Sequence, residues 1–239
     1  MTPDHAGAQW RVSPNFGPRR DGLTPTLIVL HYTAMAVTDE ACTRLCDTEF
    51  EVSAHYLIGR SGRVIQMVRE ADRAWHAGAG SWQGQDDINS RSIGIELTNT
   101  GSEPFAEAQM TALIDLLRGV QTRWAIPPHR VIGHSDMAPG RKIDPGRSFP
   151  WDALSRAGLT IGPRDIARIQ VDQMPPDTAA FAAAACRAGY PAASPESLLE
   201  AFRSRFAPAR TGPLMPEDMA DIARLAALLG SIDRPAPTA

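Results

Sequence analysis

The feature that most constrains this chain is a stretch of backbone that cannot form regular structure, residues 133–146. Prolines and glycines divide it, because proline lacks an amide donor and both residue types favour turns. The preceding residues 130–132 predict a short strand, which places His134 at a strand end. We therefore expect a loop at the edge of a sheet whose side chains are held in place by covalent constraint.

This loop carries a histidine, a lysine and a carboxylate, namely His134, Lys142 and Asp144. Neutral imidazole nitrogen and carboxylate oxygen are zinc ligands, and a catalytic zinc site uses three protein ligands. A third ligand must come from elsewhere, and His31, at the end of the apolar run 26–30, is the candidate. The residues alone leave two alternatives open, a core histidine bonded to backbone for His31 and a surface ion pair for Lys142.

Strand and helix patterns alternate along the first two thirds of the chain. Strands are predicted over residues 26–30, 53–58, 64–68, 92–97 and 130–132, and helices over residues 38–49 and 105–124. The run 26–30 is continuously apolar, as in a strand buried on both faces, while residues 105–124 place apolar side chains on one helical face. Residues 1–24, rich in proline, glycine and arginine, predict an irregular arm. The alternation indicates an α/β layered domain.

The character of the sequence changes after residue 162. Three short helices are predicted, over residues 177–188, 194–206 and 216–229, with Gly230 ending the third. We divide the chain into an α/β domain, residues 1–165, and a small C-terminal three-helix domain, residues 166–239. The bundle lacks an evident catalytic cluster, so binding is its expected role. It would either tether the chain to a polymer or pack on the α/β part and shape its groove.

Length, composition and charge exclude several classes of protein. The chain has 239 residues, a net charge of −3 and no basic excess, so we expect no nucleic-acid partner. No apolar run approaches the ~20 residues of a membrane span. The first residues lack the regions of a signal peptide, and three cysteines indicate buried, reduced thiols. We expect a cytoplasmic monomer, or a periplasmic or envelope protein if an export signal was removed.

Further candidates lie between residues 73 and 96. Glu96 sits among apolar neighbours in the strand 92–97, where a carboxylate must be neutralised, paired or beside a metal. Trp75 opens a long loop that forms either a groove wall or a lid over the core, and both readings stay open. Arg73 and Arg91 would bind carboxylates of a ligand or be solvated surface charges.

Five segments, in this order, resemble the zinc-dependent N-acetylmuramoyl-L-alanine amidases of the type 2 amidase and peptidoglycan-recognition superfamily. They are residues 29–33, 53–56, 74–78, 92–96 and 133–146. The resemblance implies a mixed central β-sheet flanked by helices, with the metal at the strand ends. It also implies hydrolysis of the amide between N-acetylmuramic acid, or its 1,6-anhydro form, and the L-alanine of peptidoglycan stem peptides, in cell-wall recycling or remodelling.

The resemblance assigns roles to individual residues. It implies zinc ligands His31, His134 and Asp144 and catalytic partners Glu96 and Lys142. Beside these, we name as candidate substrate contacts two histidines and a tryptophan of the groove and two arginines that could equally be solvated surface charges: His55, Trp75, His76, Arg91 and Arg141. The C-terminal part resembles a peptidoglycan-binding three-helix module. The alternative function is a non-catalytic muropeptide-binding receptor of the same fold. Because such receptors generally lack a ligand or a catalytic partner, the complete set favours the enzyme.

Overall fold

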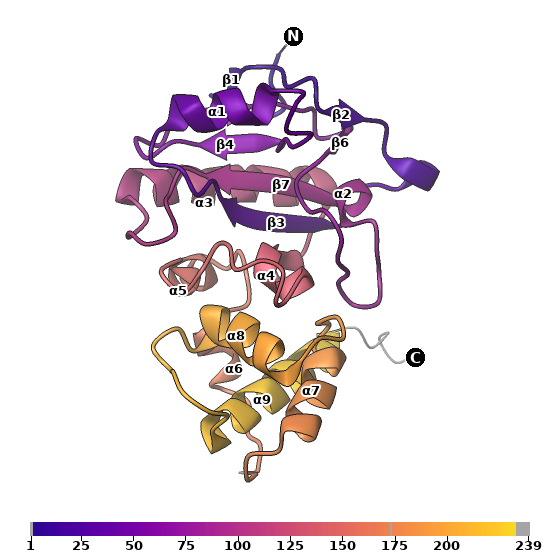
Figure 1. Ribbon diagram of the computed structural model, residues 1–239, viewed down its shortest axis with the longest axis vertical. Coiled ribbons are helices and arrows are strands. Elements are labelled where there is room, and N and C mark those ends of the chain that lie inside the picture. The colour runs from indigo at the N-terminus through magenta and orange to yellow at the C-terminus, as the bar shows by residue number, and fades with distance from the viewer. Residues whose placement is uncertain (1, 173, 233–239) are drawn as a thin grey trace.

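The computed structural model describes residues 2–172 and 174–232, and within them six strands form one mixed sheet (Figure 1). The strands of the chain are β1 Gln9–Trp10, β2 Phe16–Gly17, β3 Leu27–Tyr32, β4 Tyr56–Ile58, β5 Val64–Gln66, β6 Arg73–Ala74, β7 Ser92–Leu97 and β8 Val131–Gly133. The order in the sheet is β1–β5–β4–β7–β3–β8, and β4, β7, β3 and β8 run parallel. β4 and β5 lie in two of the predicted strand segments and pair as an antiparallel hairpin. The predicted mixed central sheet is therefore confirmed.

Helices flank the sheet on both sides, as predicted. They are α1 Thr38–Cys46, α2 Ile88–Arg91, α3 Glu107–Trp124, α4 His134–Met137, α5 Trp151–Arg156, α6 Pro163–Ile166, α7 Thr178–Arg187, α8 Pro195–Phe206 and α9 Pro216–Ile232, with 3₁₀ turns at Arg20–Gly22 and Pro128–Arg130. Figure 1 shows α6, α7, α8 and α9 gathered on one side of the sheet, with α4 and α5 between them and β3. In the described part of the chain, no helix is long and apolar enough to cross a membrane.

Alternate residues of β3 supply two different cores. Ile28 and Leu30 are buried in the core that includes α3, whereas Leu27 and Val29 belong to the core that includes α7, α8 and α9. All four side chains are fully buried, as the prediction of a strand buried on both faces requires. Side chains two residues apart point to the same face, so His31 emerges on the side of the C-terminal helices.

The C-terminal helices begin where their caps predict. The Asp177 carboxylate accepts the amide of Ala179 at the start of α7, and the Ser194 hydroxyl accepts the amide of Ser197 at the start of α8. The predicted end at Gly230 is wrong, because α9 continues to Ile232. One glycine costs a helix only ~1 kcal/mol, which is too little to end the helix by itself.

The division at residues 165/166 stays a prediction, since one apolar core runs from Leu27 of β3 into α9 without a break. Residue 173 and residues 233–239 of the predicted second domain lie outside the described residues. The structure does show that the C-terminal helices share one apolar core with residues of β3 and α4. Of the two arrangements considered above, this contact matches packing on the α/β part.

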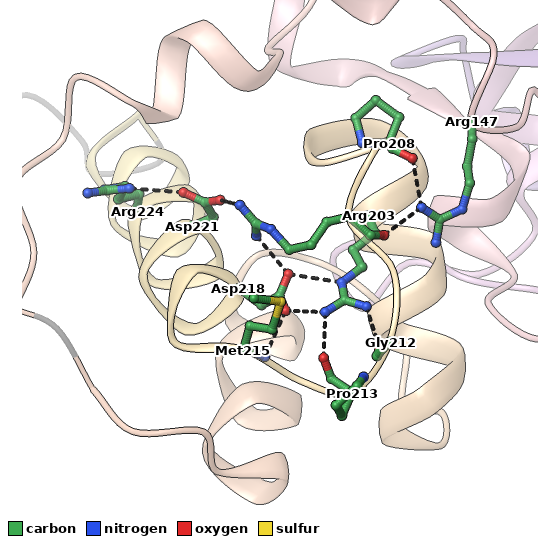
Figure 2. Close-up of polar contacts among 10 residues, drawn as sticks. Arg147, Arg203, Pro208, Gly212, Pro213, Met215, Asp218, Asp221 and Arg224 are labelled. Atoms are coloured by element: carbon green, nitrogen blue, oxygen red, sulfur yellow. Dashed lines mark hydrogen bonds and ion pairs between the residues drawn. The ribbon is translucent and has the colours of Figure 1, made fainter.

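A buried ion pair joins α8 to α9. Arg203 Nε donates to Asp218 Oδ1 at 3.0 Å, and the two side chains are 2% and 0% exposed. The Arg203 guanidinium also donates to the carbonyl oxygens of Gly212 and Pro213 at 2.6 and 2.8 Å (Figure 2). Arg210 donates to the same carboxylate at 2.7 Å. This network fixes the loop between the two helices.

Two smaller predictions need correction. The arm is not irregular throughout: β1 joins the sheet edge, since the amides of Arg11 and Ser13 continue its pairing onto β5 and the residue after it. The cysteines are free thiols but not all buried, because Cys46 is half-buried and Cys186 is exposed. A helical cysteine is buried only where its helix face meets the core, and Cys186 lies on the outer face of α7.

Candidate metal and catalytic site

The three side chains predicted as metal ligands converge at the ends of β3 and β8. His31 lies near the end of β3, His134 opens α4 directly after β8, and Asp144 belongs to the loop that follows α4. Nδ1 of His31, Nδ1 of His134 and Oδ2 of Asp144 are 2.9–3.0 Å from one another. All three residues are buried. The described residues thus contain a His/His/Asp group that could hold a metal ion.

The donor set of this group fits a divalent cation. His134 Nε2 lies 2.8 Å from the carbonyl oxygen of Ala77, so it donates its proton there and leaves a lone pair on Nδ1. Burial, together with the neighbouring His134, lowers the pKa of His31 to about 4, so its ring is neutral near pH 7. Burial opposes ionisation of Asp144, but the two adjacent histidine rings outweigh it and lower the pKa of this carboxylate. Two neutral imidazoles and one carboxylate are a ligand set that zinc takes.

The segment 133–146 that carries two of these ligands is not irregular throughout, contrary to the prediction, because His134–Met137 form the single turn α4. The backbone of the segment closes it on itself. The amide of Ser135 donates to the carbonyl oxygen of Asp144 at 2.9 Å, which brings the two ends of the loop together. The amides of Arg141 and Lys142 both donate to the carbonyl oxygen of Ala138. Side chains ten residues apart in sequence are therefore held beside each other, as the prolines and glycines predict.

Glu96 lies beside the ligand group in the neighbouring strand. It pairs in register with His31, so both side chains leave the same face of the sheet. Its Oε2 atom is buried and has no hydrogen-bond partner among the described residues. Burial, and then the negative charge of Asp144, raise the pKa of Glu96 to about 8, while Lys142 acts in the opposite direction. A cation at the ligand group would therefore favour the ionised carboxylate.

These side chains open into one cavity of about 580 Å³. The three ligands, Glu96 and Lys142 share it, and its walls include Trp75, Tyr32, Met35, Leu45 and Arg44. Arg44 was not among the predicted site residues, since an exposed arginine on a helix resembles a solvated charge. Its guanidinium stacks 3.7 Å above the ring of Phe50, which fixes its direction beside the cavity.

The other predicted substrate contacts divide into two groups. Trp75, His76 and Arg141 line the cavity. Arg141 donates to the carbonyl oxygen of Ala77 at 2.8 Å and to that of Ala79, so it also braces the opposite wall.

His55 and Arg91 are placed elsewhere, and neither is among the described residues that line this cavity. The His55 ring is fully buried, and its Nδ1 accepts the amide of Gly94 at 2.9 Å. Arg91 ends α2, and its Nε donates to the carbonyl oxygen of Asp86 at 2.9 Å. Both residues hold backbone that surrounds the site.

A buried polar cluster that sequence reasoning missed supports the turn of His134. The fully buried Asp136 accepts the amide of Gly133 at 2.8 Å, Arg205 Nη1 at 2.8 Å and the Tyr190 hydroxyl at 3.0 Å. Arg205 belongs to α8, so the C-terminal helices contact the metal-ligand turn directly. The available signal was a charge, Arg205, within the apolar stripe of that helix, although nothing in the sequence names its partner.

Comparison with known proteins agrees with this site. Residues 21–147, slightly more than half of the chain, match the family described as N-acetylmuramoyl-L-alanine amidase, and the chain belongs to that family. The matched segment includes all three candidate ligands together with Glu96 and Lys142.

Relatives of known name extend the likeness beyond that segment. The N-acetylmuramoyl-L-alanine amidase AmiD of Escherichia coli is 35% identical over 210 residues, which cover 76% of this chain and 75% of AmiD. The 1,6-anhydro-N-acetylmuramyl-L-alanine amidase AmpD of Haemophilus influenzae is 35% identical over 158 residues, 59% of this chain and 86% of AmpD.

Solved structures show the same fold. AmiD from E. coli, in complex with the substrate anhydro-N-acetylmuramic acid-L-Ala-D-gamma-Glu-L-Lys, matches with a TM-score of 0.75 at 34% identity, covering 88% of this chain and 92% of AmiD. AmpDh3 from Pseudomonas aeruginosa, in complex with anhydromuramic pentapeptide, matches with a TM-score of 0.74 at 32% identity, covering 96% of this chain and 99% of AmpDh3.

Proposed function

We propose that this chain is a zinc-dependent amidase that cleaves the bond between the lactyl carbonyl of N-acetylmuramic acid, or its 1,6-anhydro form, and L-alanine. His31, His134 and Asp144 would hold the zinc ion. Zinc bound there would supply a Lewis acid that polarises the scissile carbonyl and lowers the pKa of the attacking water.

Glu96 and Lys142 complete the chemistry. The unpartnered Oε2 of Glu96 accepts the proton of the attacking water and returns it to the leaving amine, as general base and then general acid. Lys142 lines the same cavity and places an ammonium group where the carbonyl oxygen gains negative charge. One such donor typically contributes ~3 kcal/mol to transition-state stabilisation.

The observation that carries this proposal is the meeting of three ligand atoms, a carboxylate with one buried, unpartnered oxygen and a lysine in one cavity. Taken singly, each of these groups could have a purely structural role, such as a core histidine or an ion pair. Together they supply every charge that amide hydrolysis requires, within a chain of the amidase family. A muropeptide receptor without catalysis needs none of this machinery.

The proposed substrates are anhydro-muropeptides as well as longer peptidoglycan fragments. Support comes from the two relatives whose structures hold anhydromuramic peptides. We further propose that α8 contacts longer substrates. A second cavity of about 240 Å³ shares Lys142 and Ile143 with the catalytic one, and Glu196 and Ser197 of α8 line it.

Product analysis tests the reaction. Mass spectrometry of digests of soluble anhydro-muropeptides and of intact sacculi should show free stem peptides that begin with L-alanine. Binding of muropeptides without product would instead establish the receptor.

The α8 contact needs a separate comparison. Glu196→Ala should weaken turnover of sacculi more than turnover of small muropeptides, whereas Glu217→Ala, an exposed acidic residue of α9, should change neither. Equal effects of Glu196→Ala on both substrates would contradict this contact.

Location and oligomeric state remain predictions. We propose the cytoplasm, where imported anhydro-muropeptides are recycled, and a monomer in solution. Cell fractionation tests the first, and light scattering during size-exclusion chromatography tests the second.

A further inference from the structure

A chain of hydrogen bonds runs from the ligand His31 through His76 and Ser92 to the backbone of α2. His31 Nε2 lies 3.0 Å from Nδ1 of His76, and His76 Nε2 lies 3.2 Å from the hydroxyl oxygen of Ser92. That hydroxyl lies 2.6 Å from the carbonyl oxygen of Ile88. All of these side chains are buried, so water does not compete for the bonds.

The donor and acceptor of each hydrogen bond in this chain follow from the group at its end, the carbonyl oxygen of Ile88. A carbonyl oxygen only accepts, so the Ser92 hydroxyl donates its proton to Ile88 and accepts from His76 Nε2. A neutral His76 that carries its proton on Nε2 has a lone pair on Nδ1. His31 then donates from Nε2, which leaves a lone pair on its Nδ1 for a cation held together with His134 and Asp144; without a cation, the Asp144 carboxylate 2.9 Å away would draw a proton to that Nδ1.

We propose that His76 is a positioning residue that sets the ring tautomer and orientation of His31, with Ser92 and Ile88 fixing the tautomer of His76 in turn. The inference deepens the zinc site proposed above and concerns metal binding, separate from the cleavage reaction. His76 also lines the cavity, but its contact with His31 is through the ring edge opposite the ligand group.

The fold provides the room and the anchorage for this arrangement. Gly94 lies beneath the ring of His76, where an added Cβ would stand 2.3 Å from its Cγ. The Asn89 carboxamide oxygen accepts the amides of His76 and Ala77 at 3.0 and 2.8 Å. One anchored segment therefore serves both histidine ligands, because the carbonyl of Ala77 accepts from His134 Nε2.

The hydrogen bond between the two rings can be read without substrate. In the zinc-loaded full-length protein, ¹⁵N NMR of the imidazole rings should show His76 protonated at Nε2 and unprotonated at Nδ1, with the Nε2 proton of His31 hydrogen-bonded to that Nδ1. His76→Leu, which removes the acceptor, should shift the Nε2–H signal of His31 to that of a ring without this bond. A His76 ring protonated at Nδ1 in the wild type, or a His31 signal unchanged in His76→Leu, would overturn the proposal.

Zinc affinity gives a second readout, by competition with a chelator. Loss of such a supporting partner typically weakens metal binding by ~10–100-fold, and we expect that range for His76→Leu. His76→Gln should recover part of it, because the amide oxygen can accept from His31 Nε2. Equal affinities of the wild type and His76→Leu would contradict the positioning role, whereas a wild type that binds no zinc would contradict the proposed cofactor.

Ser92→Ala has a closely matched control elsewhere in the molecule. The hydroxyl of Ser13 is equally buried, donates to the carbonyl oxygen of Leu45 at 2.6 Å and accepts the amide of Asn15 at 3.2 Å. Both substitutions should lower stability to a similar extent. Only Ser92→Ala should weaken zinc binding and change the ring signals of His76, and identical effects of the two variants would count against the proposed chain of bonds.

Discussion

Helix α8 carries two buried arginines, two residues apart, and each is paired with a fully buried aspartate. Arg203 bonds to Asp218 and so ties α8 to the start of α9 (Figure 2). Arg205 bonds to Asp136 and so ties the same helix to the turn that presents His134. A buried carboxylate without a partner is costly, so each pair fixes the backbone to which its aspartate belongs.

The two pairs resemble each other in burial and chemistry, and they differ in what they hold. One stabilises the C-terminal helices internally. The other makes these helices part of the support of the metal group, since Asp136 also accepts the amide that precedes His134. The comparison teaches that the contribution of a buried ion pair to this site depends on where its aspartate lies. Through Arg205, the C-terminal helices help to hold the turn that presents His134.

The largest expected effect comes from removing the ligand itself. His134→Ala leaves two protein ligands, fewer than a catalytic zinc site uses, so zinc and activity should both be lost while Arg205 and Asp136 stay paired. Metal analysis of the purified variant decides the point. Full zinc content would remove His134 from the ligand set and would leave the Arg205 pair without a metal ligand to support.

Glu96→Gln separates chemistry from support. The substitution keeps the shape of the side chain, both ion pairs and the zinc, but it removes the group that moves the proton. We expect kcat to fall by ~10²–10⁴-fold with little change in metal content. If only KM rose, the general-base role of Glu96 would be wrong.

Arg205→Met tests the comparison directly, with Arg203→Met as its control. Each variant removes the buried arginine of one pair. Stability should fall by ~3–5 kcal/mol in Arg205→Met and by less in Arg203→Met, because Arg210 still pairs with Asp218. Only Arg205→Met should also weaken zinc binding, by ~10-fold, because only its aspartate holds the His134 turn. Chelator competition on the folded protein at low temperature measures this difference. Equal zinc affinities of the two variants would show that the Arg205–Asp136 pair does not support the metal site more than the Arg203–Asp218 pair does.

Tyr190→Phe is the mildest probe of the same cluster. It removes one hydrogen bond to Asp136 and keeps the ring that packs against Trp82. A hydrogen bond to a charged group contributes ~1.5–3 kcal/mol, so a modest drop in melting temperature is expected, with a zinc affinity between those of the wild type and Arg205→Met. A variant that weakened zinc more than Arg205→Met would show that the tyrosine is the main support.

The sequence predicts the catalytic half of the molecule well, because its signals are local. The apolar run that ends at His31, the strand of Glu96 and the Pro/Gly loop with His134 and Asp144 each carry their own evidence. The pieces meet because parallel strands end at one edge of a sheet. The predicted end at Gly230 was wrong, since one glycine costs a helix too little to end it.

Contacts between distant segments could not be predicted in this way. An apolar stripe shows that a helix is covered, without showing what covers it, so the packing of α8 against α4, in one core with residues of β3, came only from the structure. For the same reason, Arg205 gave no hint of Asp136, 69 residues away. His76 was predicted as a groove residue, and its bond to the far side of His31 depends on the space above Gly94.

The central claim is that this chain hydrolyses the muramoyl–L-alanine amide. The most direct test is turnover of an anhydro-muropeptide by the zinc-loaded full-length protein in H₂¹⁸O, followed by mass spectrometry of both products. Hydrolysis of this bond should place one ¹⁸O in the lactyl carboxylate of the muramic acid product and none in the stem peptide. Label in the peptide would show that another bond is cut, and bound but uncleaved muropeptide would show that the chain is a receptor.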